Sequence, residues 1–178
     1  TSHYKAASAS YSLNVEQKNV QELSFPKSIV NKKYGDSNYT IVANHPVGDG
    51  DVTYSSSNTN VATVDNSGTV TIVGVGTAII TATAAETSDY SSSSASYSLN
   101  VDKSNQLLSF PVSSVNKTEG DSPFSIIVTH SVGDGTVTYS SSDMNVATVD
   151  NSGRVTIIGL GTATITAQAS STSHYKTS

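Results

Sequence analysis

The sequence contains one unit written twice, and the second copy follows the first at a constant offset of 85 positions. The stretch Val47–Gly50 recurs at Val132–Gly135. A longer stretch, Asn60–Gly68, recurs at Asn145–Gly153. Between positions 21 and 93, 48 of the 73 positions carry the same amino acid as the position 85 further on, without a gap. A fixed period of this kind indicates a tandem array in which each unit is one structural module, so the chain does not share one continuous core.

The ends of the chain do not coincide with the ends of a unit. Residues 1–15 (TSHYKAASASYSLNV) closely match residues 87–101 (TSDYSSSSASYSLNV), which end the first complete unit. The chain finishes at residue 178, before another ASYSLNV segment has been reached. We therefore expect an excerpt of a longer array, divided into residues 1–18 as the last strand of a preceding repeat, residues 19–103 as repeat 1, and residues 104–178 as repeat 2 without its last strand.

Short alternating patterns predict that each unit is built from β-strands. In Ala78–Thr83 and its copy Ala163–Gln168, one alternating set of positions stays Ala, Ile and Ala, while the other set is mainly Thr. A period of two places the first set in a core and the second in solvent. We predict strands of the first unit at 21–25, 38–44, 51–56, 60–64, 69–73, 77–84 and 95–101. Strands spaced about ten residues apart are typical of a two-sheet sandwich, so the predicted fold class is all-β.

Composition limits the functions that such units can have. The absence of Cys excludes a disulfide scaffold, a thiolate metal site and a cysteine nucleophile. Only 13% of the residues are charged, and the net charge is −5 with nine Lys and Arg, so we expect no nucleic acid partner. The apolar runs are far shorter than the roughly 20 residues of a membrane helix, so we expect no direct membrane insertion. The 33 Ser and 22 Thr supply neutral polar side chains for outward strand positions and turns.

One pattern extends through both copies and points to a known family. It reads VTYSSSN…VATVD-x-SG-x-VTI-x-G-x-GTA-x-ITA through Val52–Ala82 and recurs, with Asp in place of the Asn, through Val137–Ala167. This pattern resembles the bacterial immunoglobulin-like domain, group 2, and the resemblance covers essentially the whole chain. Lys33–Asp36 (KYGD) is also similar to the YGD signature of related bacterial surface repeats, whereas the copy at Thr118–Asp121 reads TEGD. The resemblance implies tandem immunoglobulin-like β-sandwiches without disulfides.

The resemblance also implies a function class. Such modules are mostly non-catalytic structural or spacer units of bacterial cell-surface or secreted adhesin-like proteins, which places this chain in an extracellular or cell-surface location with neighbouring repeats as its partners. The sequence lacks the Gly-x-Ser-x-Gly motif of a hydrolase nucleophile, and we expect no enzyme. The alternative is an adhesive module that binds a host protein or a glycan. Tyr34 and Tyr90 are the candidate ligand-binding residues, because the other tyrosines weighed fall on inward strand positions.

Two acidic loops are weak candidates for a metal site. Asp49 and Asp51 of the first unit and Asp134 of the second could offer carboxylate oxygens to calcium, which takes six to eight oxygen ligands. The competing interpretation is that Asp and Gly form tight turns here, since the second loop has Thr136 where the first has Asp51. The four histidines have no two-His spacing on one strand face. We therefore expect no catalytic residues, no metal and no cofactor, with calcium as the alternative.

A third hypothesis of function comes from the unmatched ends. An open sheet edge accepts an added strand. The leading segment of one molecule could complete repeat 2 of the next, which would give head-to-tail fibres. The alternative is that this segment pairs within its own chain. The strand-exchange candidates are the residues of the ASYSLNV segment: Ala9, Ser10, Tyr11, Ser12, Leu13, Asn14 and Val15.

Overall fold

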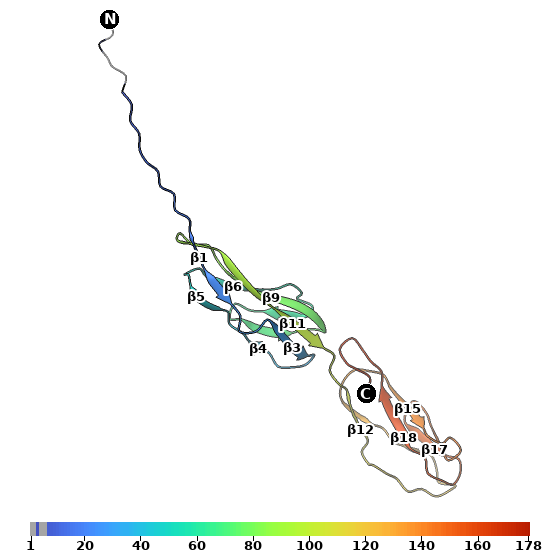
Figure 1. Ribbon diagram of the computed structural model, residues 1–178. Coiled ribbons are helices and arrows are strands. Elements are labelled where there is room, and N and C mark those ends of the chain that lie inside the picture. Colours follow the sequence, from blue (N-terminus) through green and yellow to red (C-terminus); the bar gives the residue numbers. More distant parts are fainter. Residues whose placement is uncertain (1–2, 4–6) are drawn as a thin grey trace.

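A computed structural model describes residue 3 and residues 7–178, and every regular element in them is a β-strand. The predicted all-β fold class is therefore confirmed. The two repeats follow each other along one elongated molecule, and an extended segment precedes the first strand (Figure 1). None of the described residues forms a helix that is long and apolar enough to cross a membrane.

The larger sheet of repeat 1 has four strands. Its order is β3 (Ile29–Lys33), β11 (Ser93–Asp102), β9 (Gly76–Ala84) and β6 (Val52–Ser56). The long strand β11 is antiparallel to β9, with Tyr97 opposite Ile80, and parallel to β3, with Leu99 opposite Val30. Because β11 pairs along both of its edges, it is the central element of this sheet.

The second layer of repeat 1 is made of shorter pieces. Strands β4 (Tyr39–Thr40), β8 (Thr69–Ile72) and β7 (Ala62–Val64) form a three-stranded sheet, and β2 (Glu22–Ser24) pairs with β5 (Asn44–Val47). At the end where the chain enters the repeat, β1 (Asn19–Val20) pairs in parallel with β10 (Tyr90–Ser91). The two layers enclose the core.

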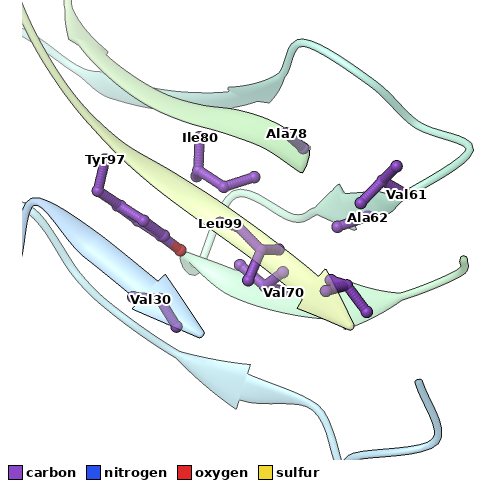
Figure 2. Close-up of a cluster of buried hydrophobic side chains, with 9 residues drawn as sticks. Val30, Val61, Ala62, Val70, Ala78, Ile80, Tyr97 and Leu99 are labelled. Carbon is purple, nitrogen blue, oxygen red and sulfur yellow. The ribbon is translucent and has the colours of Figure 1, made fainter. Parts of the chain in front are cut away.

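The core of repeat 1 is small and mostly aliphatic. Figure 2 shows Val30, Ile80, Tyr97 and Leu99 of the four-stranded sheet facing Val70 and its neighbours in the other layer. Phe25 packs edge-on against Tyr97, with ring centroids 4.9 Å apart. The Tyr97 hydroxyl lies 3.3 Å from the Tyr39 hydroxyl. Burial raises the pKa of Tyr97 and of Tyr39, so both rings stay neutral over the whole physiological range.

The structure adds the short pair β1 and β10, which was not predicted, and corrects the predicted strands in two further places. Strand β3 was not predicted, because Val30 is the only one of its five residues that is fully buried and the alternation is therefore weak. The strand predicted at 38–44 is two strands, β4 and β5, which pair with different partners in the second layer. Ala43 lies between them, and its N–H donates a hydrogen bond of 2.9 Å to the Tyr54 hydroxyl, which replaces a ladder bond.

Repeat 2 contains fewer strands than repeat 1. It has three small sheets, made of β12 (Leu107–Ser109) with β14 (Thr129–Val132), of β13 (Phe124–Ser125) with β17 (Arg154–Ile157) and β16 (Ala147–Val149), and of β15 (Val137–Ser141) with β18 (Ile165–Ala169). Among the residues that the structure describes, no segment takes the place that β11 has in repeat 1. Two other strands change with it. The segment equivalent to β3 is not a strand, and β18 lacks the first four residues of its counterpart β9.

Burial differs between the two repeats, because the sequence ends at Ser178, where the counterpart of β11 would begin. In repeat 1, Ala62, Ala78, Ile80 and Ala82 are buried. Their counterparts in repeat 2, which are the same residue types at positions 147, 163, 165 and 167, are only half-buried. The two repeats have nearly the same sequence here, so the difference follows from the missing strand and not from the side chains.

Candidate functional site

The junction between the repeats is short and hydrogen-bonded. Strand β11 ends at Asp102, and Ser104 already forms a parallel bridge with Tyr175 of repeat 2. The Ser104 N–H donates a hydrogen bond of 3.0 Å to the carbonyl of His174. Only Lys103 therefore separates the last ladder residue of repeat 1 from the first paired residue of repeat 2.

Aromatic rings pack across this junction. The ring of Tyr34, in the turn after β3, stacks on the ring of His174, with centroids 4.1 Å apart and planes 19° apart. Tyr175 meets the same tyrosine ring edge-on at 5.6 Å. The Ser104 hydroxyl donates a hydrogen bond to the carbonyl of Tyr34. The predicted ligand-binding residue Tyr34 thus contacts repeat 2, and stacked and edge-on pairs of this kind stabilise a contact beyond the apolar area they bury.

Tyr90, the other predicted ligand-binding residue, lies at the opposite end of repeat 1. Its half-buried ring belongs to β10, which pairs with β1, and the Tyr90 N–H donates a hydrogen bond of 3.2 Å to the Thr87 hydroxyl. Tyr90 is the counterpart of Tyr175, so it occupies the position that would face a preceding repeat. The structure does not bring Tyr34 and Tyr90 together.

A buried glutamine organises the end of each repeat where the chain enters. The side-chain amide of Gln21 donates hydrogen bonds to the carbonyls of Ala85 (2.7 Å) and Ser91 (2.9 Å). Its oxygen accepts a hydrogen bond of 3.0 Å from the Gly50 N–H and lies 3.0 Å from the His45 ring nitrogen Nε2. All four hydrogen-bonding positions of the amide are therefore used. We call this arrangement the glutamine clamp.

Repeat 2 repeats three of these four contacts, whereas Nε2 of His130, the counterpart of His45, is buried without a hydrogen-bond partner. The side-chain amide of Gln106 donates to the carbonyls of Ser170 (2.7 Å) and Lys176 (2.8 Å) and accepts from the Gly135 N–H (2.9 Å). The sequence analysis missed this pair. The available signal was that Gln21 and Gln106 are identical residues at equivalent positions of the two copies, followed in each copy by the same VGDG loop.

The clamp explains the glycines of the acidic loops. A Cβ atom on Gly50 would lie 2.1 Å from the carbonyl oxygen of Ala85 and 2.8 Å from the side-chain oxygen of Gln21, so only glycine fits at this position. Asp49 accepts a hydrogen bond of 2.9 Å from the Thr87 hydroxyl, which ties the loop to the segment after β9.

The predicted calcium ligands lie in these loops and do not converge. In repeat 2, Asp134 accepts a hydrogen bond of 2.7 Å from the Thr172 hydroxyl, just as its counterpart Asp49 does from Thr87. The side chain of Asp51 is exposed. In the described part of the chain, no three His, Cys, Asp or Glu side chains lie close enough together to hold a metal ion. The carboxylates of Asp49 and Asp134 thus serve as loop braces.

Repeat 2 has an open groove, lined by both polar and apolar residues, where repeat 1 has β11. The groove has a volume of about 530 Å³ and lies between residues 112–117 on one side and residues 159–165 on the other. Its floor includes Phe124, Ala147, Val155 and Ile157. Val115, the counterpart of the buried Val30, is exposed at the rim. The groove is therefore the space that a last strand would fill.

The segment before β1 carries the matching strand sequence. Ala9–Val15 has the same amino acids, ASYSLNV, as Ala95–Val101 of β11. In the leading segment Tyr11, Leu13 and Val15 are 90%, 76% and 80% exposed. The same three residue types in β11 are 2%, 0% and 2% exposed. An exposed run of this kind is unusual because each apolar side chain loses the free energy it would gain from burial.

Comparison with known proteins identifies the family. A family model described as "Intimin, immunoglobulin-like domain" matches residues 38–86 and residues 128–171, which together make up just over half of the chain and fall one in each repeat. The chain belongs to this family of immunoglobulin-like domains of bacterial surface proteins. The match confirms the predicted resemblance to bacterial immunoglobulin-like domains and the β-sandwich fold.

Solved structures give more distant likenesses. They include mouse protocadherin-24 EC1-3 (12% identity, 85% of this chain, TM-score 0.38). They also include a SusE-like surface located polysaccharide binding protein of Bacteroides thetaiotaomicron (16% identity, 87% of this chain, TM-score 0.35). A third is domains 1–6 of the surface layer protein SbsC (21% identity, 78% of this chain, TM-score 0.35). The chain spans 65%, 32% and 22% of these three chains, which is less than two thirds of each. The sequence has no match among the curated proteins.

Proposed function

We propose that the repeats are non-catalytic spacer modules of a bacterial cell-surface or secreted adhesin-like protein. The observation that carries this proposal is the junction, in which one residue, Lys103, links two repeats that also contact each other through the Tyr34 ring. A flexible linker would let two domains point in many directions. A linker of one residue, flanked by ladder hydrogen bonds and a ring stack, favours a fixed direction and a constant length for each repeat.

The side chains also support a structural role. The clearly shifted pKa values in the described part of the chain have structural causes: turn hydrogen bonds at Asp65 and Asp150, an exposed ion pair at Glu86, and burial of the neighbouring core residues Tyr39 and Tyr97. An active site would gather such groups in one cleft. The family assignment adds support, because the chain is an immunoglobulin-like domain of a bacterial surface protein. An extracellular or cell-surface location belongs to the same proposal.

The alternative of an adhesive module has less support. Of its two candidate residues, Tyr34 is covered by the His174 ring. Tyr90 occupies the equivalent of the Tyr175 position, where a junction with a preceding repeat would form. Retention of the full chain on a glycan array, lost on substitution of Tyr90, would favour the adhesive alternative over the spacer.

The spacer proposal is tested by measuring the distance between equivalent points of the two repeats. The chain has no Cys, so single labels can be placed by Asn66→Cys and Asn151→Cys, two exposed turn positions that are equivalent in the two copies. Spin-label distance measurements should give one narrow distribution at roughly 35–40 Å, the length of about 11 extended residues. A broad distribution, or a much shorter distance from repeats that lie side by side, would contradict a rigid spacer.

A further inference from the structure

The two edges of the four-stranded sheet in repeat 1 differ in charge. Strand β3 forms one edge and carries Lys32 and Lys33, and charged side chains of this kind protect an open edge against further pairing. Strand β6 forms the other edge, and its sequence VTYSS contains neither a charge nor a proline. Strand β15 of repeat 2 has the same five residues and pairs with β18 alone. Each repeat therefore has one edge without the usual protection, and we call β6 and β15 the VTYSS edges.

The backbone of β6 offers hydrogen-bonding groups at its edge. Just beyond the strand, the Ser57 N–H donates a hydrogen bond of 2.9 Å to the carbonyl of Ile79, so Ser57 bonds toward β9. Hydrogen-bonded residues recur at every second position of an antiparallel ladder, which assigns Ser55 and Thr53 to β9 as well. The three residues in between direct their N–H and C=O groups away from the sheet, and within the described part of the chain none of these groups has a partner. They are Val52, Tyr54 and Ser56.

Repeat 2 presents the same groups at its own edge. There the Ser142 N–H donates a hydrogen bond of 3.0 Å to the carbonyl of Thr164, so the alternation in β15 matches that in β6. The side chains of Thr138 and Ser140 are exposed, as are those of their counterparts in β6. The residues whose backbone groups point away from the sheet are Val137, Tyr139 and Ser141.

The free groups of one VTYSS edge are complementary to those of a second. When two such strands run antiparallel with Tyr54 opposite Tyr54 of the other copy, Val52 lies opposite Ser56 on either side. Each of these three pairs then exchanges two hydrogen bonds, as hydrogen-bonded pairs do in an antiparallel ladder. We propose that the VTYSS edge of one molecule pairs in this register with the VTYSS edge of a second copy of this chain.

The side chains permit this pairing. Between the hydrogen-bonded pairs, Thr53 of one copy lies opposite Ser55 of the other, and both are exposed on the outer face of the sheet. Cross-strand pairs of hydroxyl side chains stabilise a sheet, and neither strand brings a charge into the contact. Asp51, which precedes β6, lies opposite Ser57 in this register, so no two carboxylates oppose each other.

The pairing names a partner for the spacer, which goes beyond the proposed function. The chain carries two identical edges, so it can engage other copies through both repeats and associate with them side by side. The spacer proposal rests on the junction at Lys103, so a failure of this pairing would leave it intact.

The first experiment measures the mean mass of the full chain by light scattering over a range of concentrations. We expect the mass to rise from that of one chain to at least twofold. A variant with two lysines on each VTYSS edge places like charges opposite each other in every edge pair, so it should stay monomeric at each concentration. Its substitutions, all at exposed positions, are Thr53→Lys, Ser55→Lys, Thr138→Lys and Ser140→Lys.

The matched control adds four lysines to exposed outer positions of β11 and β18, away from the edges. It carries Ser94→Lys, Ser96→Lys, Thr166→Lys and Gln168→Lys, which give the same net charge. This control should associate as the original chain does, and circular dichroism shows whether both variants keep the fold. An original chain that is monomeric at all concentrations, edge lysines that leave association unchanged, or a control that loses it equally would overturn the proposal.

The second experiment reads the register from single amides. The N–H groups of Val52, Tyr54 and Ser56 should exchange with solvent at least about 10-fold more slowly in a concentrated sample than in a dilute one, because pairing gives them partners. The amides of Thr53 and Ser55 already bond to β9 and are the internal reference, whose exchange should change far less. An equal change at all five positions would contradict edge pairing.

The third experiment uses disulfides, since the chain has no Cys. A mixture of a Thr53→Cys chain and a Ser55→Cys chain should form a mixed disulfide under mild oxidation, because these residues are directly opposite in the proposed register. Either variant oxidised alone should form far less, since identical positions are offset by two residues. Equal crosslinking in the mixture and in the separate variants would rule out this register.

Discussion

Two identical residues that the sequence analysis overlooked stabilise the loops of this molecule. Gln21, between β1 and β2, is 1% exposed, and its amide binds the VGDG loop at Gly50, the segment after β9 at Ala85 and strand β10 at Ser91. A fully satisfied buried amide contributes little net free energy when intact but is costly to break, because each partner left unpaired keeps its desolvation penalty.

We predict that Gln21→Ala lowers the free energy of unfolding of repeat 1 by about 2–4 kcal/mol, since the Gly50 N–H and two carbonyls lose a buried partner. Gln17→Ala, in the exposed leading segment, is the matched control and should change it by less than about 0.5 kcal/mol. Urea unfolding, monitored through the hydrogen exchange of amides in repeat 1, measures the stability of both variants. Equal stability of the two variants would show that water replaces the amide.

The hairpin turns of both repeats are held by an exposed aspartate. One carboxylate oxygen of Asp65 accepts hydrogen bonds from the Ser67 hydroxyl (2.6 Å) and from the N–H groups of Ser67 (2.9 Å) and Thr69 (3.0 Å). These bonds, the Ser67 hydroxyl first, lower the pKa of Asp65 below its ordinary value of 3.8. Asp150 has the same partners at the equivalent positions, and its pKa is lowered in the same way.

A lowered folded-state pKa gives stability that is present above the unfolded pKa and is lost as pH falls through the folded pKa. We therefore predict that the contribution of these two turns is complete above about pH 5, starts to fall near the unfolded value of 3.8, and is gone only below the lowered folded pKa. The double variant Asp65→Asn, Asp150→Asn should be less stable at neutral pH and should lose less stability on acidification. Thermal unfolding at neutral pH and at acidic pH checks this prediction. Asp51→Asn, which changes an exposed carboxylate outside the turns, is the control. Parallel pH profiles of wild type and double variant would contradict the prediction.

At the scale of elements, strand β11 determines the secondary structure of its neighbours. Residues 29–33 and 76–79 of repeat 1 pair only with β11, and their counterparts in repeat 2 are not strands. The sequence could predict β9 and β11, because their alternation is strong. It could not predict β3, since a strand with one buried side chain exists only where a partner offers it a ladder.

This dependence predicts a difference in local stability between two nearly identical sequences. Backbone amides of residues 165–167 in β18 should exchange with solvent at least about 10-fold faster than the matching amides of residues 80–82 in β9, because Ile165 and Ala167 are only half-buried whereas Ile80 and Ala82 are buried. Hydrogen exchange read by NMR measures each pair of amides. A chain with the β11 sequence SASYSLNVD (residues 94–102) added after Ser178 serves as the control and should bring the two rates together. Similar rates in the original chain would mean that the last strand adds little to the sandwich.

At the scale of the whole molecule, the internal repetition of the sequence predicted the number of repeats and the fold of each. It could not predict the junction. The contact joins Tyr34 to His174, and neither residue recurs in the other copy, since the counterpart of Tyr34 is Glu119 and the counterpart of His174 is Asp89. Tyr34 was therefore predicted as a ligand-binding residue, whereas in the structure its ring contacts repeat 2.

The ring stack should therefore control how rigidly the repeats are aligned. We predict that Tyr34→Ala widens the distance distribution between labels at positions 66 and 151 at least twofold, since only the single-residue linker and its backbone hydrogen bonds would remain. Tyr34→Phe keeps the ring and should keep the narrow distribution. An unchanged distribution in Tyr34→Ala would assign the alignment to the Ser104 bridge alone.

The parallel pairing of β3 with β11 has a mechanical consequence. A pull on the two ends of repeat 1 reaches β3 from the entry side and β11 from the exit side, and five ladder positions join these strands. Because the strands run the same way, the load acts along them in shear, and the hydrogen bonds must break together and not one after another. A repeat in which β3 and β11 are paired in this way is thus a link that resists tension along the array.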